Sequence, residues 1–131
     1  MDTCEILKHA DTIAVVGISS DSNKTSRSIA GYLAKAGYKV FGVNPNCKST
    51  ELEGIPIYKS LTDIPVPIDI INVFRRSGDI PDLIPDVLAV NPKVLWLQSG
   101  IRNDEAVKPV IDRGIIAIQD TCIFVEHSRC N

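Results

Sequence analysis

Short apolar segments alternate with stretches of helical length along the whole chain, and this alternation restricts the possible folds more than any other feature. The apolar segments are rich in Ile and Val. They occupy residues 12–17, 39–43, 68–74, 94–97 and 115–118. Near-continuous apolar segments of this length are typical of strands that are buried on both faces of a parallel sheet.

The stretches between these segments have helical spacing. Ile29 and Leu33 lie one turn apart, and Gly37 follows as a suitable residue for ending a helix. Pro85 is unfavourable inside the third predicted helix. Helices are expected at residues 2–9, 26–36, 79–89 and 104–113.

Repeated strand–helix–strand units imply right-handed crossovers, with helices on both faces of one sheet. We therefore predict an α/β fold, a doubly wound Rossmann-like domain with a mostly parallel sheet of five to six strands, including a minor strand at residues 55–58. The 131 residues correspond to about one domain. No Pro-, Gly- or Ser-rich linker divides the chain, so the predicted domain spans residues 1–131.

Charge and hydropathy exclude several classes of partner. The chain has 14 basic and 16 acidic residues, a net charge of −2, whereas general nucleic-acid binders have a basic excess. We expect no nucleic-acid partner and no membrane association, because no apolar stretch approaches the length of a membrane span. The first residues also lack the apolar region of a signal peptide, which predicts a cytoplasmic protein.

The four cysteines show no metal-binding or redox motif. None forms a CxxC pair, and none has a histidine at metal-ligand spacing, so no metal site is predicted. A chain that can build its own core needs no disulfides, which favours reduced thiols. These cysteines are Cys4, Cys47, Cys122 and Cys130.

Small, amide or cationic residues follow every predicted buried strand. In open α/β sheets, ligands bind outside the carboxyl ends of the strands, where the strand order reverses. The sequence therefore predicts a binding site on one edge of the sheet. The segments concerned are residues 17–26, 44–46, 75–78, 98–100 and 119–122.

The first of these segments is suited to phosphate. Gly17 allows a sharp turn, and the helix that begins near Thr25 offers free N–H groups and a positive dipole end. Lys24 and Arg27 add positive charge. A solvated helix start with a Ser or Thr cap is the alternative interpretation. The small side chains that let phosphate approach the main chain are Ser19, Ser20, Ser26 and Ser28.

Two common nucleotide motifs are absent. A dinucleotide site would read GxGxxG and carry an acidic residue near the end of the second strand, where this chain has Asn44 and Pro45. The GxxxxGK[ST] motif of P-loop proteins is also missing. An NAD(P)-binding regulator is therefore a less favoured alternative.

Five motifs in order resemble one known family. They are VVGIS at residues 15–19 with Lys24 and Ser26, GYKVFGVNP at 37–45, NVFRRS at 72–77, LWLQSGIRNDEA at 95–106 and a closing DTC at 120–122. This pattern resembles the small stand-alone CoA-binding protein family, which is similar to the CoA-binding domain of the succinyl-CoA synthetase α subunit. The resemblance covers about residues 12–129.

The resemblance implies that coenzyme A, free or acylated, binds in an extended pose across the strand edge. The first loop then matches the phosphate loop, and the Asn-Pro turn lines the adenosine. Phe74 and Arg75 match the end of the family's fourth strand, and the loop of Gln98 and Gly100 lies beside the pantetheine arm. Cationic side chains would neutralise the phosphates. With the loop argument above, the predicted coenzyme-binding residues are Gly17, Ser19, Ser20, Lys24, Ser26, Asn44, Pro45, Phe74, Arg75, Gln98 and Gly100.

No catalytic constellation is visible in the sequence. His9 and His127 lie outside the strand-end loops, and no GxSxG elbow occurs. Cys122 is the single nucleophile candidate, although a buried structural thiol is the simpler interpretation. We expect a non-catalytic carrier, sensor or presenting module for CoA or acyl-CoA. The alternative is a CoA-linked acyl-transfer or thiol-exchange enzyme that uses Cys122.

Overall fold

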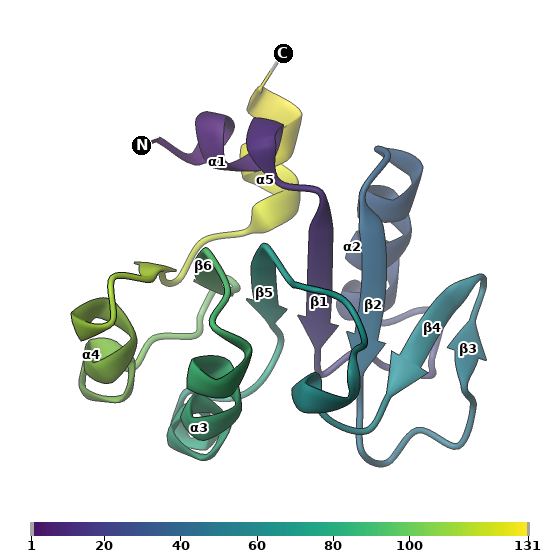
Figure 1. Cartoon of the computed structure of the whole chain (residues 1–131). Helices are drawn as coiled ribbons and strands as arrows, with labels where there is room; N and C mark the ends of the chain where they lie inside the picture. Colours follow the sequence, from purple (N-terminus) through teal and green to yellow (C-terminus); the bar gives the residue numbers. More distant parts are fainter. Residues whose placement is uncertain (1, 131) are drawn as a thin grey trace.

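The computed structural model describes residues 2–130, which form a sheet with helices on both faces (Figure 1). Within these residues the sheet has seven strands in the order β3-β4-β2-β1-β5-β6-β7. The strands are β1 (Thr12–Val16), β2 (Lys39–Val43), β3 (Glu51–Leu52), β4 (Ile55–Tyr58), β5 (Ile70–Val73), β6 (Val94–Leu97) and β7 (Ile116–Ile118). All pairs are parallel except β3 with β4.

The helices of the described residues complete two covering layers. The α-helices are α1 (Thr3–His9), α2 (Thr25–Lys35), α3 (Ile80–Val90), α4 (Asp104–Asp112) and α5 (Ile123–Arg129), with the 3₁₀ turns η1 (Leu61–Asp63) and η2 (Ser77–Asp79). None of these helices is both long enough and apolar enough to cross a membrane.

The predicted fold class is confirmed, with one strand more than expected. Strand β3 has only two residues, too few to show a pattern in the sequence, and it pairs antiparallel with β4 at one edge. Helix α5 is also absent from the prediction. All helices and strands that the sequence predicts are present, and their ends differ from the predicted ones by at most two residues.

Side chains of each central strand alternate between two apolar clusters. In β1, Ile13 and Val15 pack with α1, α2 and α5, whereas Ala14 and Val16 pack with η1, α3 and α4. All four side chains are fully buried. Burial on both faces explains why the strands appear as continuous apolar segments, since neither face meets water. Each large aliphatic side chain buried in this way contributes about 1.5–3 kcal/mol to folding.

Helix ends follow the local sequence. The side chain of Asp2 accepts a hydrogen bond from the backbone N–H of Glu5 at 2.9 Å, which caps α1. Helix α3 continues through Pro85 and ends at Asn91, whose φ of 54° is left-handed. Pro85 is thus tolerated within a helix that packs an apolar face onto the sheet.

The order of strands reverses beside β1. Strand β2 lies on one side of β1 and β5 lies on the other, with all three parallel. The connections that leave β1 and β5 therefore diverge to opposite faces of the sheet. In open α/β sheets, such a divergence leaves a crevice at the carboxyl ends of the strands, the usual place for a ligand.

The two ends of the described chain meet, and a disulfide joins them. Cys4 in α1 and Cys130 after α5 are bonded, with 5.5 Å between their α-carbons. The prediction of four reduced thiols is therefore wrong for this pair, because the fold brings together residues 126 positions apart. Cys47 and Cys122 are free.

Candidate functional site

The carboxyl ends of the central strands are tied together by hydrogen bonds. The backbone N–H groups of Gly17, Phe74 and Gln98 each donate to the carbonyl of the last residue in the neighbouring strand, at 2.9, 2.8 and 3.2 Å. These three bonds link the ends of β2, β1, β5 and β6. The strand ends therefore converge on one edge, as the sequence predicts.

Gly17 allows the end of β1 to lie very close to the end of β5. Its φ is +87°, which favours glycine, and a β-carbon at this position would lie 2.5 Å from the carbonyl oxygen of Phe74. No other residue fits there without displacing the backbone. The turn that leaves β1 is thus set by the contact with the end of β5.

A groove of about 750 Å³ opens along this edge, between the ends of β5 and β6 and the starts of α2 and α5. Four predicted binding residues line it, namely Phe74, Arg75, Gln98 and Gly100. The lining residues outside the predicted set are Thr25, Arg76, Ser77, Ser99, Ile101 and Cys122.

The first loop is held in shape by its own side chains. The Oγ atom of Ser26 accepts a hydrogen bond from the backbone N–H of Ser19 at 3.0 Å, and Ser26 is buried. Ser20 and Lys24 are exposed on the same loop. Ser19 and Ser26 therefore shape the loop from within, while Ser20 and Lys24 face solvent.

Arg27 lies inside the molecule instead of facing a ligand. Its guanidinium donates to the carbonyls of Ser19 and Ser20, at 3.4 and 2.9 Å, and to the carboxylate of Glu53 at 2.7 Å. The side chain is only 7% exposed. The expectation that Arg27 offers its charge to phosphate is therefore wrong, because this charge is already used to hold the loop.

The second loop is joined to the first through Asn44. Its side-chain amide donates to the carbonyl of Ile18 at 2.8 Å, and its Oδ1 accepts from the backbone N–H of Asn46 at 2.8 Å. Pro45 is exposed beside it. These two residues do not line the groove, and they lie with the first loop at the ends of β1 and β2.

Positive charge at this edge is in part uncompensated. Within residues 2–130, Lys24 and Arg75 have no ion-pair partner, whereas Arg76 and Arg102 pair with nearby aspartates at 3.8 and 3.1 Å. Lys24 is also the N-cap of α2, and its side chain makes no capping hydrogen bond. The predicted alternative, a Ser or Thr cap, is therefore not what the structure shows. An uncapped helix start beside a free cation is suited to an anion.

A buried polar chain leads from the sheet to the groove. The side-chain amide of Asn72 donates to Gln98 Oε1 at 3.2 Å, and Gln98 Nε2 donates to the sulfur of Cys122 at 3.0 Å. Asn72 is fully buried, and its Oδ1 atom has no hydrogen-bond partner. Sequence reasoning missed Asn72, although a single amide within the apolar segment 68–74 is the signal that could have found it.

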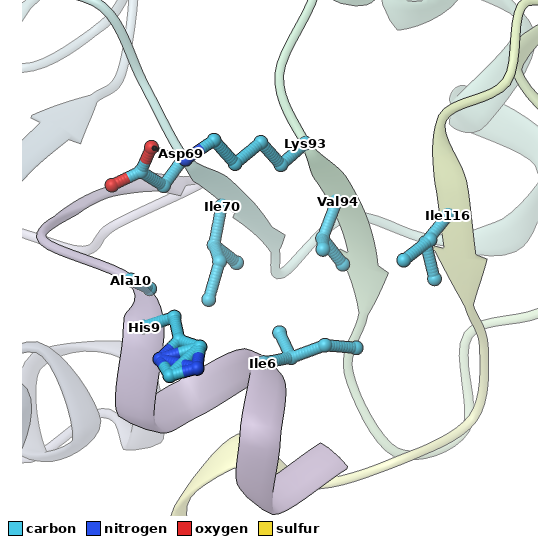
Figure 2. Close-up of a pocket in the computed structure, with 8 residues that line it drawn as sticks. All are labelled: Ile6, His9, Ala10, Asp69, Ile70, Lys93, Val94 and Ile116. Atoms are coloured by element: carbon cyan, nitrogen blue, oxygen red, sulfur yellow. Dashed lines mark ion pairs between the residues drawn. The ribbon is translucent and has the colours of Figure 1, made fainter. Parts of the chain in front are cut away.

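A second pocket lies at the opposite, amino ends of the strands, beside α1 (Figure 2). This pocket of about 280 Å³ is lined mainly by aliphatic side chains. Two charged residues of opposite sign also line it, and they pair with each other, with Lys93 Nζ 3.5 Å from Asp69 Oδ1. Desolvation alone would raise the pKa of Asp69, but the N–H groups of Asp11 and Thr12 and the Lys93 ammonium outweigh it and lower that pKa. We interpret Asp69 as a structural carboxylate that joins the starts of β1, β5 and β6.

The doubly wound fold and the groove at the carboxyl edge of its sheet define a Rossmann-like ligand-binding domain. Residues 11–128 match the family described as CoA binding domain. The chain belongs to this family, as the sequence resemblance predicts.

Individual relatives agree in sequence and in structure. The uncharacterized protein YneT of Bacillus subtilis is 39% identical over 124 residues, 95% of this chain and 90% of that protein. A Thermus thermophilus structure titled cell-free ID.343 is 40% identical, with a TM-score of 0.93 and 98% of both chains covered. A dinucleotide-forming acetyl-coenzyme A synthetase of Ca. Korarchaeum cryptofilum is 26% identical with a TM-score of 0.66, matching 79% of this chain and 23% of that one.

Proposed function

We propose that this protein binds coenzyme A or acyl-CoA in the groove at the carboxyl edge of its sheet and catalyses no reaction on its own. It would act as a carrier, a sensor or a module that presents the coenzyme. The observation that supports this best is the joint placement of Phe74, Arg75, Gln98 and Gly100 around one groove in a chain of the CoA binding domain family.

The charges at this edge suit the coenzyme. A 3′-phosphorylated ADP carries several negative charges, and Lys24 and Arg75 offer cations that no described carboxylate neutralises. The uncapped start of α2 adds N–H groups next to Lys24. Phe74 is half-buried and offers apolar surface at the same place.

The lack of histidine and carboxylate groups among the described lining residues of the groove supports a binding role. The lining residues within the described chain include no histidine and no carboxylate. His9 lies by the pocket at the opposite edge, and His127 contacts Tyr32 through its Nδ1 atom at 2.7 Å. Among these described lining residues, only the Cys122 thiol could take part in a proton transfer.

Titration calorimetry with CoA, dephospho-CoA and NADH tests this proposal. We expect CoA to bind more tightly than dephospho-CoA, and NADH to bind least. Replacing either Lys24 or Arg75 with Gln should weaken CoA binding roughly tenfold and reduce its salt dependence. Lys35→Gln, at the other end of α2, is the matched control and should change neither. No binding at millimolar CoA would refute the proposal.

A second candidate function is thiol exchange at Cys122. Its thiol is free, lines the groove and accepts a hydrogen bond from Gln98 Nε2 at 3.0 Å. The thiolate would attack CoA disulfide, forming a protein–CoA disulfide and releasing one CoA thiol. Release of CoA thiol that Cys122→Ser abolishes, with CoA binding retained, would establish this activity.

A further inference from the structure

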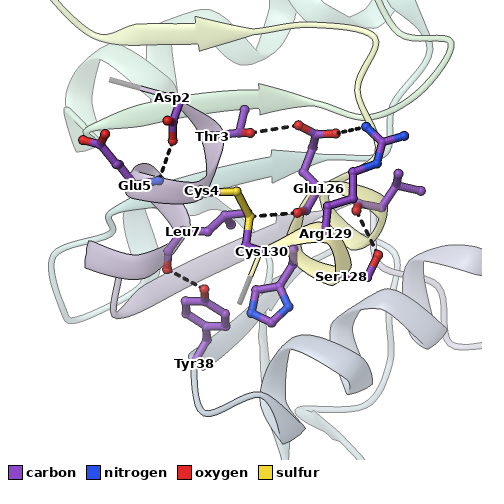
Figure 3. Close-up of a disulfide and its surroundings, with 12 residues drawn as sticks. Asp2, Thr3, Cys4, Glu5, Leu7, Tyr38, Glu126, Ser128, Arg129 and Cys130 are labelled. Carbon is purple, nitrogen blue, oxygen red and sulfur yellow. Dashed lines mark hydrogen bonds and ion pairs between the residues drawn. A yellow bond between two sulfur atoms is a disulfide. The ribbon is translucent and has the colours of Figure 1, made fainter.

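The disulfide between the terminal helices lies in a groove that the proposed function leaves unexplained. Figure 3 shows the Cys4–Cys130 bond between α1 and α5, with Tyr38 and Arg129 nearby. The groove around it has a volume of about 490 Å³. Cys4 is exposed and Cys130 is half-buried. Because Cys4 and Cys130 both line this groove, a small thiol can approach the disulfide from it.

Hydrogen bonds and apolar packing also hold α1 and α5 in place. The Thr3 hydroxyl donates to the carboxylate of Glu126 at 2.8 Å. The hydroxyl of Tyr38 donates to the carbonyl of Leu7, which fixes α1 to the segment just before β2. Burial, and then the neighbouring Tyr32, raise the pKa of Tyr38, so this donor stays protonated. Helices of seven residues are unstable alone in water, so both depend on the disulfide, on these hydrogen bonds and on the burial of Ile6, Leu7 and Ile123.

The start of α5 lies beside the groove at the carboxyl edge of the sheet, which we call the coenzyme groove. Cys122 precedes α5 and lines that groove, and the N–H of Ile123 donates to Gln98 Oε1 at 3.3 Å. Trp96 Nε1 also donates to the carbonyl of Thr121 at 2.9 Å. Helix α5 therefore spans from the disulfide to the groove, a distance of about 10 Å for seven residues.

Helix α5 also contacts the helix on the other side of the groove. Tyr32 in α2 packs edge-on against Phe124 with 4.7 Å between ring centroids, and its hydroxyl lies 2.7 Å from His127 Nδ1. The first residue of α2, Thr25, lines the groove. A displacement of α5 would therefore alter the coenzyme groove in two ways, through the residues at the start of α5 and through the contact of α5 with α2.

We propose that the Cys4–Cys130 disulfide is a reversible redox latch that holds α5 in place and so controls how tightly the coenzyme groove binds its ligand. The binding readout of this inference rests on the proposed function. A thiolate of a small thiol attacks Cys4, and Cys130 leaves as a thiolate that takes up a proton. A second thiol then attacks the mixed disulfide and releases Cys4 as a thiol. The small thiols are oxidised to their disulfide, and the two cysteines are reduced.

The test compares the oxidised protein with the same protein after treatment with dithiothreitol under native conditions. Titratable thiols should rise from two to four. Amide exchange of α1 and α5 should become at least about tenfold faster, and CoA should bind about fivefold more weakly. Cys4→Ser, Cys130→Ser and the double variant should all behave like the reduced protein and no longer respond to dithiothreitol, because each removes the same bond.

Two results would overturn the latch. One is a disulfide that resists dithiothreitol until the protein unfolds, and the other is a reduced protein in which α5 and residues 98–101 exchange as slowly as before. Failure of the oxidised protein to bind CoA would instead refute the proposed function. The thiol count and the exchange rates would still decide on the latch in that case.

Discussion

Gly17 and Phe74 are in contact at the point where the strand order reverses. A β-carbon on Gly17 would lie 2.5 Å from the Phe74 carbonyl oxygen, and the N–H of Phe74 donates to the last residue of β1 at 2.8 Å. The ends of β1 and β5 can therefore be this close only because residue 17 has no side chain. This contact determines both the path of the first loop and the position of Phe74 in the groove.

Gly17→Ala should lower both stability and coenzyme affinity. Alanine would be strained at φ +87° and would clash with Phe74, so we expect the free energy of unfolding to fall by about 2–4 kcal/mol in urea denaturation. Gly114→Ala is the matched control, because Gly114 has a φ of +91° with open space around it. Its cost should be limited to about 1 kcal/mol, with CoA binding unchanged. Equal costs for the two variants would contradict the close contact.

Arg27→Met should loosen the first loop. The substitution keeps the apolar stem but leaves the carbonyls of Ser19 and Ser20 without their donor. We expect a loss of about 1–2 kcal/mol in stability and weaker binding of CoA, measured by denaturation and calorimetry.

Glu53→Gln separates the ion pair from the loop contacts. The carboxylate of Glu53 is 76% exposed, so its charge adds little to the stability of the pair. This variant should lose at most about 0.5 kcal/mol and keep the affinity for CoA. A loss as large as that of Arg27→Met would show that the ion pair, and not the loop contacts, carries the effect.

Sequence patterns predict most of this fold because burial and local turns determine it. The apolar strands, the helix spacing and Gly17 are all local signals, and the predicted segments 39–43, 55–58 and 94–97 match β2, β4 and β6. The resemblance to a family correctly identified the CoA binding domain. The predicted edge of the sheet also proved to be where the strand ends converge.

The features that sequence reasoning missed depend on contacts between distant residues. Arg27 looks like a free cation until the hairpin brings Glu53 to it. Cys4 and Cys130 show no pairing motif, because only the packing of α1 against α5 places them together. Asn72 looks like an interruption in an apolar strand until the fold places beside it Gln98, the residue that follows β6.

Asp69→Asn should make stability less dependent on pH in acid. The pKa of Asp69 is lowered in the folded protein, so its contribution is present above the unfolded pKa and is lost as the pH falls through the folded pKa, below about pH 4. At pH 7 the variant should be about 1–2 kcal/mol less stable than the native protein in urea denaturation, and this difference should shrink towards pH 3.

Asp112→Asn is the control for this pH dependence. Asp112 is exposed at the end of α4 and lies outside the hydrogen bonds that surround Asp69. It should leave stability unchanged at both pH values. A stability difference for Asp69→Asn that stays constant from pH 7 to pH 3 would show that the side chain acts by shape and not by charge.

Asn72→Val should weaken coenzyme binding without weakening the fold. Valine removes a buried oxygen that has no partner, and Gln98 Oε1 keeps its hydrogen bond from the N–H of Ile123. The free energy of unfolding should therefore stay the same or rise by up to about 1 kcal/mol. Gln98 loses the donor that orients its side chain in the groove, so CoA affinity should fall about fivefold in calorimetry.

A double-mutant cycle with Gln98→Leu decides whether Asn72 acts through Gln98. Residues in one hydrogen-bonded chain are coupled, so the affinity lost in the Asn72→Val/Gln98→Leu protein should equal that of Gln98→Leu alone. Additive losses would mean that Asn72 affects the coenzyme independently of Gln98. Unchanged affinity in Asn72→Val together with a stability loss above about 1 kcal/mol would make Asn72 a structural residue. The unpartnered oxygen would then be a cost of the fold and not a feature of the site.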